Sequence, residues 1–128
     1  MTNEVIRSYR DLAVWRSSMD LAQASYLFTA TFPKSEMYGL TSQIRRSATS
    51  VAANIAEGHG REHTGSFVQS LRIAQGSLKE FETHVLLAGR VKLAADKEVD
   101  ALMSSADDLG RKLRALIRSL QRRMETQG

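Results

Sequence analysis

The spacing of apolar residues is the feature that most restricts how this chain can fold. In four long segments, largely apolar side chains recur at steps of three and four residues, which returns them to one face of an α-helix. The first two series are Leu12, Trp15, Met19, Ala22, Tyr26, Thr29 and Leu40, Ile44, Ala48, Val51, Ile55. The other two are Phe67, Leu71, Ala74, Leu78, Phe81, Val85, Ala88 and Leu102, Ala106, Leu109, Leu113, Leu116, Leu120, Met124. No segment alternates with the period of two that strands show, so the sequence predicts four helices.

Few residues interrupt these helices. Ser8 and Asp11 match a capping box for the first helix, and Pro33, the only proline, should end it, because a proline disfavours helical conformation in the residue before it. Gly58 offers a left-handed cap for the second helix, and Thr64 can cap the third. The expected helices span about residues 9–32, 37–58, 64–90 and 96–125.

The chain length of 128 residues fits one domain, residues 1–128. Because the connections are short, consecutive helices must run in opposite directions. The expected fold is all-α, an antiparallel up-down-up-down four-helix bundle. Cysteine is absent, which excludes thiolate metal sites and favours a cytoplasmic location. No apolar run is long enough for a membrane span or a signal peptide, so we expect no membrane partner.

Positive charge is concentrated in the last expected helix. The net charge of +4 and pI near 9.8 permit a polyanionic partner without requiring one. The segment from Arg111 to Arg123 holds six basic residues and no acidic one. Four of them lie opposite the leucine series: Arg111, Arg114, Arg118 and Arg122. Such a stripe can follow a phosphate backbone, or it can be a solvated face whose charges suit the helix dipole. Secondary candidates for phosphate contact are Arg45, Arg46, Arg61 and Arg72.

Polar residues also share one face of the second helix: Arg46, Ser50, Asn54 and Glu57. They can form a ligand groove, but a hydrogen-bonded network between helices or subunits, with Arg46 paired to Glu57 or Glu80, is the favoured interpretation. No member of this set is a nucleophile beside its base, so no catalytic residue, enzymatic activity or cofactor is expected. The alternative of an enzyme stays open only for a site on this polar face, where Glu57→Gln would abolish activity without affecting folding or assembly.

The segment Gly58–Arg61 between the second and third helices contains two glycines and a histidine. It resembles a phosphate-binding loop only superficially, because the glycines follow a helix rather than a strand, and a tight turn is favoured. His59 and His63 have the spacing of metal ligands on a helix, but Gly60 argues against a continuous helix there, so no metal site is expected.

Some apolar residues lie outside these four series. Val14, Leu21 and Phe28 form a second line on the first helix, and Ile73, Gly76 and Leu87 form one on the third. These lines either widen the core contact or face another subunit, and the subunit interface is favoured.

Several segments together carry a family resemblance: Ser8–Trp15, Phe32–Pro33, Glu36–Leu40, Gln43–Ala48, Asn54–Arg61 and Ile73–Glu80. In this order and spacing they resemble the bacterial four-helix-bundle family named for proteins encoded within 23S rRNA intervening sequences. The resemblance extends to about Ala88, and the last helix matches in pattern only. It implies a cytosolic ring, typically a homopentamer, without enzymatic activity. It also implies similarity to accessory proteins of diversity-generating retroelements, which bind nucleic acid and a reverse transcriptase.

These observations favour a non-enzymatic homo-oligomeric bundle that binds RNA or DNA electrostatically, as an accessory factor. Because few aromatic residues are available for base stacking, sequence-specific reading of single strands is not expected. The alternative is a scaffold that binds a partner protein and has no nucleic-acid role.

Overall fold

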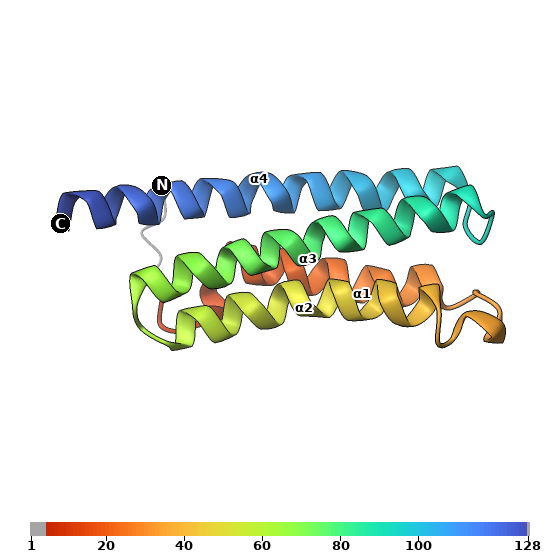
Figure 1. The fold of residues 1–128 in the computed structure, drawn as a ribbon, viewed down its shortest axis with the longest axis horizontal. Helices are drawn as coiled ribbons and strands as arrows, with labels where there is room; N and C mark the ends of the chain where they lie inside the picture. Colours follow the sequence, from red (N-terminus) through yellow and green to blue (C-terminus); the bar gives the residue numbers. More distant parts are fainter. Residues whose placement is uncertain (1–4, 128) are drawn as a thin grey trace.

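The computed structural model describes residues 5–127 and consists of four long helices joined by short connections. They are α1 (Ala13–Thr29), α2 (Leu40–Gly60), α3 (Thr64–Arg90) and α4 (Asp96–Gln127), with short 3-10 helices η1 (Tyr9–Asp11) and η2 (Lys34–Glu36). The chain reverses direction at each connection (Figure 1). Residues 5–127 contain no strand. The predicted fold, an all-α antiparallel four-helix bundle, is confirmed.

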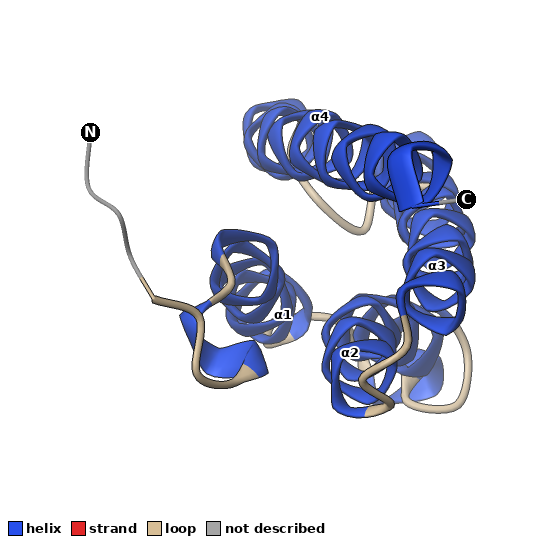
Figure 2. Ribbon diagram, turned by 90° about the vertical axis from the view of Figure 1, so that its left-hand side faces the viewer, coloured by secondary structure: helices blue, strands red, loops and turns tan. Residues whose placement is uncertain are grey.

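Each helix packs against its neighbours in the chain, and α1 also contacts α4. The diagonal pairs, α1 with α3 and α2 with α4, stay apart. Viewed end-on, the helices follow one another around a common centre (Figure 2). This order places α3 between α2 and α4, so any site shared by α4 and another helix must involve α3 or α1.

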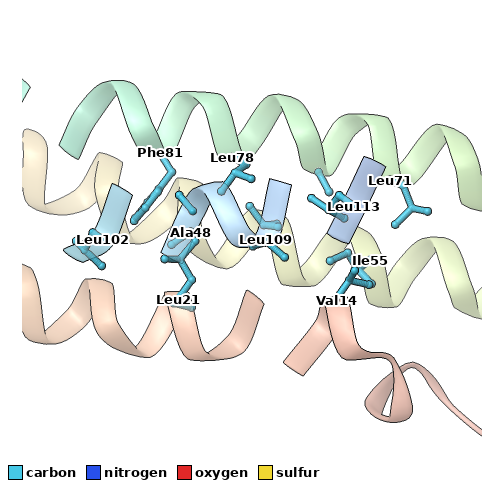
Figure 3. Packing of buried hydrophobic residues seen from close by; sticks show 14 of the residues in the cluster. Val14, Leu21, Ala48, Ile55, Leu71, Leu78, Phe81, Leu102, Leu109 and Leu113 are labelled. Carbon is cyan, nitrogen blue, oxygen red and sulfur yellow. The ribbon is translucent and has the colours of Figure 1, made fainter. Parts of the chain in front are cut away.

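The apolar series predicted for α2, α3 and α4 form most of the core. Phe81, Leu78 and Leu71 of α3 point into the bundle toward Leu109 and Leu113 of α4 (Figure 3). All five are buried, as are Ile44, Val51 and Ile55 of α2. Only Met124, at the end of the predicted α4 series, is exposed.

The inward face of α1 differs from the prediction. Met19 and Tyr26 of the predicted series are 45% and 49% exposed. Val14, Leu21 and Phe28, predicted as an outward line toward a subunit, are buried in the core, so that prediction is wrong. They alternate with two buried serines, in the series Val14, Ser18, Leu21, Ser25 and Phe28.

These two serines explain why the buried face of α1 differs from the predicted one. The Ser18 hydroxyl donates to the Val14 carbonyl oxygen, and the Ser25 hydroxyl donates to the Ala22 carbonyl oxygen at 2.6 Å. Because each hydroxyl is satisfied within its own helix, both serines can be buried at little cost. A prediction that treats serine as a surface residue therefore assigns the wrong face of α1 to the core.

The capping box at Ser8 and Asp11 is confirmed, but it caps η1 rather than α1. The Ser8 hydroxyl accepts from the Arg10 N–H, and the Asp11 carboxylate accepts from the Ser8 N–H. Leu12 is extended, so α1 begins only at Ala13. The helix ends at Thr29, four residues before Pro33, and Pro33 instead precedes η2. The expected limits of 9 and 32 for the first helix are therefore too wide.

The Asp11 carboxyl offers a test of this cap. Its pKa is lowered from the ordinary value by the hydrogen bonds from the Arg7 and Ser8 N–H groups, since these favour the ionised form. The cap should therefore stabilise the protein above the ordinary pKa of aspartate and lose that effect as the pH falls through the lowered one. We expect NMR titration to find Asp11 below the unperturbed value. An ordinary value would mean that the cap does not persist in solution.

The α2–α3 turn also departs from the prediction. Helix α2 starts at Leu40 rather than 37 and continues through Gly58 to Gly60, and no glycine among the described residues has a positive φ. The left-handed residue of this turn is Glu62, with φ 57°. Gly58 is instead buried against α3, where an added Cβ would lie 2.4 Å from the Ser70 Cβ. Thr64 is not the cap of α3, because the His63 ring accepts from the Ser66 N–H in that role.

Candidate nucleic-acid interface

Four exposed arginines line the outer side of α4: Arg111, Arg114, Arg118 and Arg122, here called the basic face. The buried side of the same helical segment consists of Leu109, Leu113, Ile117 and Leu120. Because the leucines pack into the bundle, the arginines lie on the sides of α4 that do not face the core. The basic face spans about three turns, roughly 16 Å along the helix axis.

The members of the basic face differ in their partners. Arg111 forms an ion pair with Asp108 on the preceding turn. Arg114, Arg118 and Arg122 have no carboxylate within 4.0 Å in the described part of the chain. The Arg122 Nε donates to the Arg118 carbonyl oxygen at 3.4 Å. Three of the four guanidinium groups therefore keep their charge uncompensated by a close internal anion.

A groove between α3 and α4 adjoins the basic face. It has a volume of about 400 Å³ and is lined by Arg72, Gln75, Gly76, Leu78, Lys79, Gly110 and Arg114, here called the α3/α4 groove. The structure thus brings Arg72 of α3 together with Arg114 of α4. Lys79 was not among the residues predicted from the sequence. It lies seven residues after Arg72, which is about two helical turns, so the same spacing argument would have placed both on one face.

The other candidate arginines, Arg45, Arg46 and Arg61, lie on α2 or just after it. Arg45 holds α2 to α1: its Nε donates to the Thr29 hydroxyl at 2.8 Å, and its guanidinium lies 4.5 Å from the centre of the Tyr26 ring. Arg46 donates to the Gln43 side chain. Arg61 forms an ion pair with Glu57. Because α2 and α4 lie diagonally, Arg45 and Arg46 do not extend the basic face.

The predicted polar network on α2 forms only in part. The hydroxyls of Ser50 and Ser77 share a hydrogen bond of 2.9 Å, and the Asn54 amide donates to the Ser50 carbonyl oxygen. Within one subunit, Arg46 pairs with neither Glu57 nor Glu80 among the described residues; a pairing between subunits stays a prediction. Arg46 cannot reach Glu57 of its own helix, because the two residues are about three helical turns apart, roughly 16 Å.

A comparison with known protein families matches most of the chain. The family described as 23S rRNA-intervening sequence protein matches residues 10–115. The chain belongs to this family. The match includes α1, α2, α3 and the first part of α4, so Arg111 and Arg114 lie within it and Arg118 and Arg122 lie beyond it.

A solved structure has the same fold as this member of the 23S rRNA-intervening sequence protein family. It is a crystal structure of a protein of unknown function from the S23 ribosomal protein family of Bacteroides thetaiotaomicron VPI-5482. The TM-score is 0.73 at 23% sequence identity, with 82% of this chain and 98% of that chain covered. No curated protein matches. Neither the family description nor the Bacteroides protein gives any indication of catalysis.

The histidines near the α2–α3 turn have packing and capping contacts in this family member. The His59 ring packs edge-on against Phe67, with ring centres 5.5 Å apart, and His63 caps α3. Across residues 5–127, no group of three or more His, Cys, Asp or Glu side chains is placed to hold a metal ion. No helix in the same range is both long and apolar enough to cross a membrane.

Proposed function

We propose that the protein is a homo-oligomeric bundle that binds nucleic acid through the basic face of α4. The observation that carries this proposal is the row of exposed arginines, of which Arg114, Arg118 and Arg122 have no close carboxylate among the described residues. Guanidinium groups in such a row contact successive phosphates and release the counterions that surround the nucleic acid. Binding of this kind is independent of base sequence and weakens steeply with salt.

Self-association would gather several basic faces into one assembly. Exposed apolar side chains on α1 support such contacts: Met19, Tyr26 and Leu27. In a ring such as a pentamer, weak phosphate contacts on several subunits would add to a useful avidity. The absence of cysteine favours action in the cytoplasm, as an accessory factor on a nucleic acid.

Replacing Arg111, Arg114, Arg118 and Arg122 together by glutamine tests this proposal. We expect weaker binding to duplex DNA and to structured RNA, to a similar degree for all sequences. On duplex DNA, the slope of log affinity against log salt should decrease by about 0.9 for each phosphate that the variant no longer neutralises. The measurement is fluorescence anisotropy over a salt series, with the oligomer mass checked by light scattering.

The matched control replaces Arg46 of α2 and Lys34 of η2 by glutamine, since both residues are exposed and neither α2 nor η2 contacts α4. That variant should bind as the original protein does. If the control weakened binding and the basic-face variant did not, the interface would be on the α2 side. Assembly without any salt-sensitive binding would support the alternative, a scaffold for a partner protein.

A further inference from the structure

We infer that the α3/α4 groove is a binding pocket for the phosphodiester backbone of a single nucleic-acid strand. This inference rests on the proposed function and assigns part of the contact to a particular site. The groove combines an open shape with positive groups from two helices, whereas the rest of the basic face is a convex helix surface. The shape and the charge are independent observations that point to the same class of ligand.

Two glycines line the groove, one on each helix. Gly76 of α3 is exposed, and a Cβ added there would meet nothing within 4 Å. Gly110 of α4 is buried, with Leu78 3.6 Å from the position of an added Cβ. A larger residue at Gly76 would project into space that is now empty. Backbone rather than side chain therefore forms part of the groove wall, which lets an extended ligand approach closely.

The positive groups converge on this opening from both sides. The Nη1 atom of Arg114 lies 3.8 Å from the position of a Gly110 Cβ, so its guanidinium folds over the groove. Arg72 lines the opposite wall, on α3. Lys79 is held at 3.1 Å by Glu82, whose carboxylate offsets part of its charge. Two arginines and the Gln75 amide remain to bind a phosphate, and arginine suits this because its planar fork donates two parallel hydrogen bonds.

The size and lining of the groove favour a backbone over a base. The volume of about 400 Å³ exceeds that of one phosphate and leaves room for adjoining sugars. No aromatic residue lines the groove, so it offers no platform for base stacking. A duplex is too thick to enter a groove between two packed helices, because their axes are only about 8–10 Å apart. The expected ligand is an extended single strand bound without base preference.

The test fills the groove without changing the charge of the protein. In the Gly76→Leu variant, the new side chain meets no existing atom at its Cβ, and leucine favours helix more than glycine does, so the fold should persist. We expect affinity for an oligothymidylate to fall about tenfold, equivalent to the loss of one charge-assisted hydrogen bond. Affinity for duplex DNA should stay within about twofold, because the duplex uses the outer arginines.

Gly60→Leu is the matched control, since Gly60 is also an exposed helical glycine with no atom within 4 Å of an added Cβ. It should bind both probes as the original protein does. An Arg72→Gln/Arg114→Gln variant is a second test of the groove. It should weaken oligothymidylate binding more than duplex binding. Light scattering on all variants separates groove filling from a change in assembly. Equal loss for both probes in Gly76→Leu at unchanged mass would overturn the single-strand assignment.

Other outcomes separate this inference from the proposed function. Unchanged oligothymidylate binding by Gly76→Leu, with binding abolished in the basic-face variant, would overturn the groove and leave the proposed function standing. Absence of binding to either probe by the original protein would overturn both. Titration with inorganic phosphate, followed through the NMR amide signals of Gly76 and Gly110, distinguishes the source of the phosphate. Shifts at saturating phosphate without any oligothymidylate binding would indicate a free-phosphate site and overturn the strand assignment.

Discussion

Phe81→Ala is expected to lower the free energy of unfolding by about 3–5 kcal/mol, a large share of the stability of a domain of this size. Phe81 is 0% exposed and points from α3 into the core (Figure 3). Its removal loses the burial of an aromatic ring and leaves a cavity that the long, packed helices can close only in part. Urea unfolding followed by circular dichroism measures the change.

Leu86→Ala, on the same helix, is the control for Phe81→Ala. Leu86 is 47% exposed, so its truncation should cost well under half as much. Both substitutions change a helical residue to alanine and raise helix propensity or keep it, which leaves burial as the main difference. A loss below about 1 kcal/mol for Phe81→Ala would contradict the core described above.

Gly58→Ala should destabilise the protein by about 1–3 kcal/mol, although alanine normally stabilises a helix relative to glycine. The added Cβ would lie 2.4 Å from the Ser70 Cβ and 3.2 Å from an edge carbon of Phe67. The Ser70 Cβ is bonded directly to the backbone, so relief requires that α2 and α3 move apart. Urea unfolding followed by circular dichroism measures this change as well. Gly76→Ala is the control, because its Cβ meets open space and should be neutral or stabilising.

Ser70→Gly tests whether the effect of Gly58→Ala comes from its contact with Ser70. It removes the atom with which the new Cβ collides, so Gly58→Ala in the Ser70→Gly background should cost less than in the original protein. The double-mutant cycle should give a coupling energy of about 1 kcal/mol or more. Additive effects would show that Gly58→Ala acts elsewhere, for example through the end of α2.

Part of the candidate site was predictable because it lies within one helix. The exposed positions of Arg111, Arg114, Arg118 and Arg122 follow from the leucines on the other side of α4. The α3/α4 groove was not predictable, because it depends on the register between two helices. Arg72 and Arg114 are far apart in the chain, and a shift of α4 by one turn along α3 would separate them.

The contacts of the α2 arginines also could not be predicted from the sequence. Arg45 was a candidate for phosphate contact, but it packs on Tyr26 and bonds Thr29, both on α1. The sequence around Arg45 does not reveal these contacts, because they depend on which helix lies beside α2. Arg46 and Glu57 do not pair within one subunit for a simpler reason, since residues eleven apart on one helix are too distant for an ion pair.

The helical class, the number of helices and the core faces of α2, α3 and α4 follow from periodicity, because helix hydrogen bonds and the faces they create are local to each segment. The inward face of α1 and the role of Gly58 required the packed bundle. Serines can be buried when their hydroxyls bond within the helix, and a glycine is needed only where another backbone comes close. Which face of α1 is buried, and where two backbones come close, depend on how the helices pack, which periodicity does not specify.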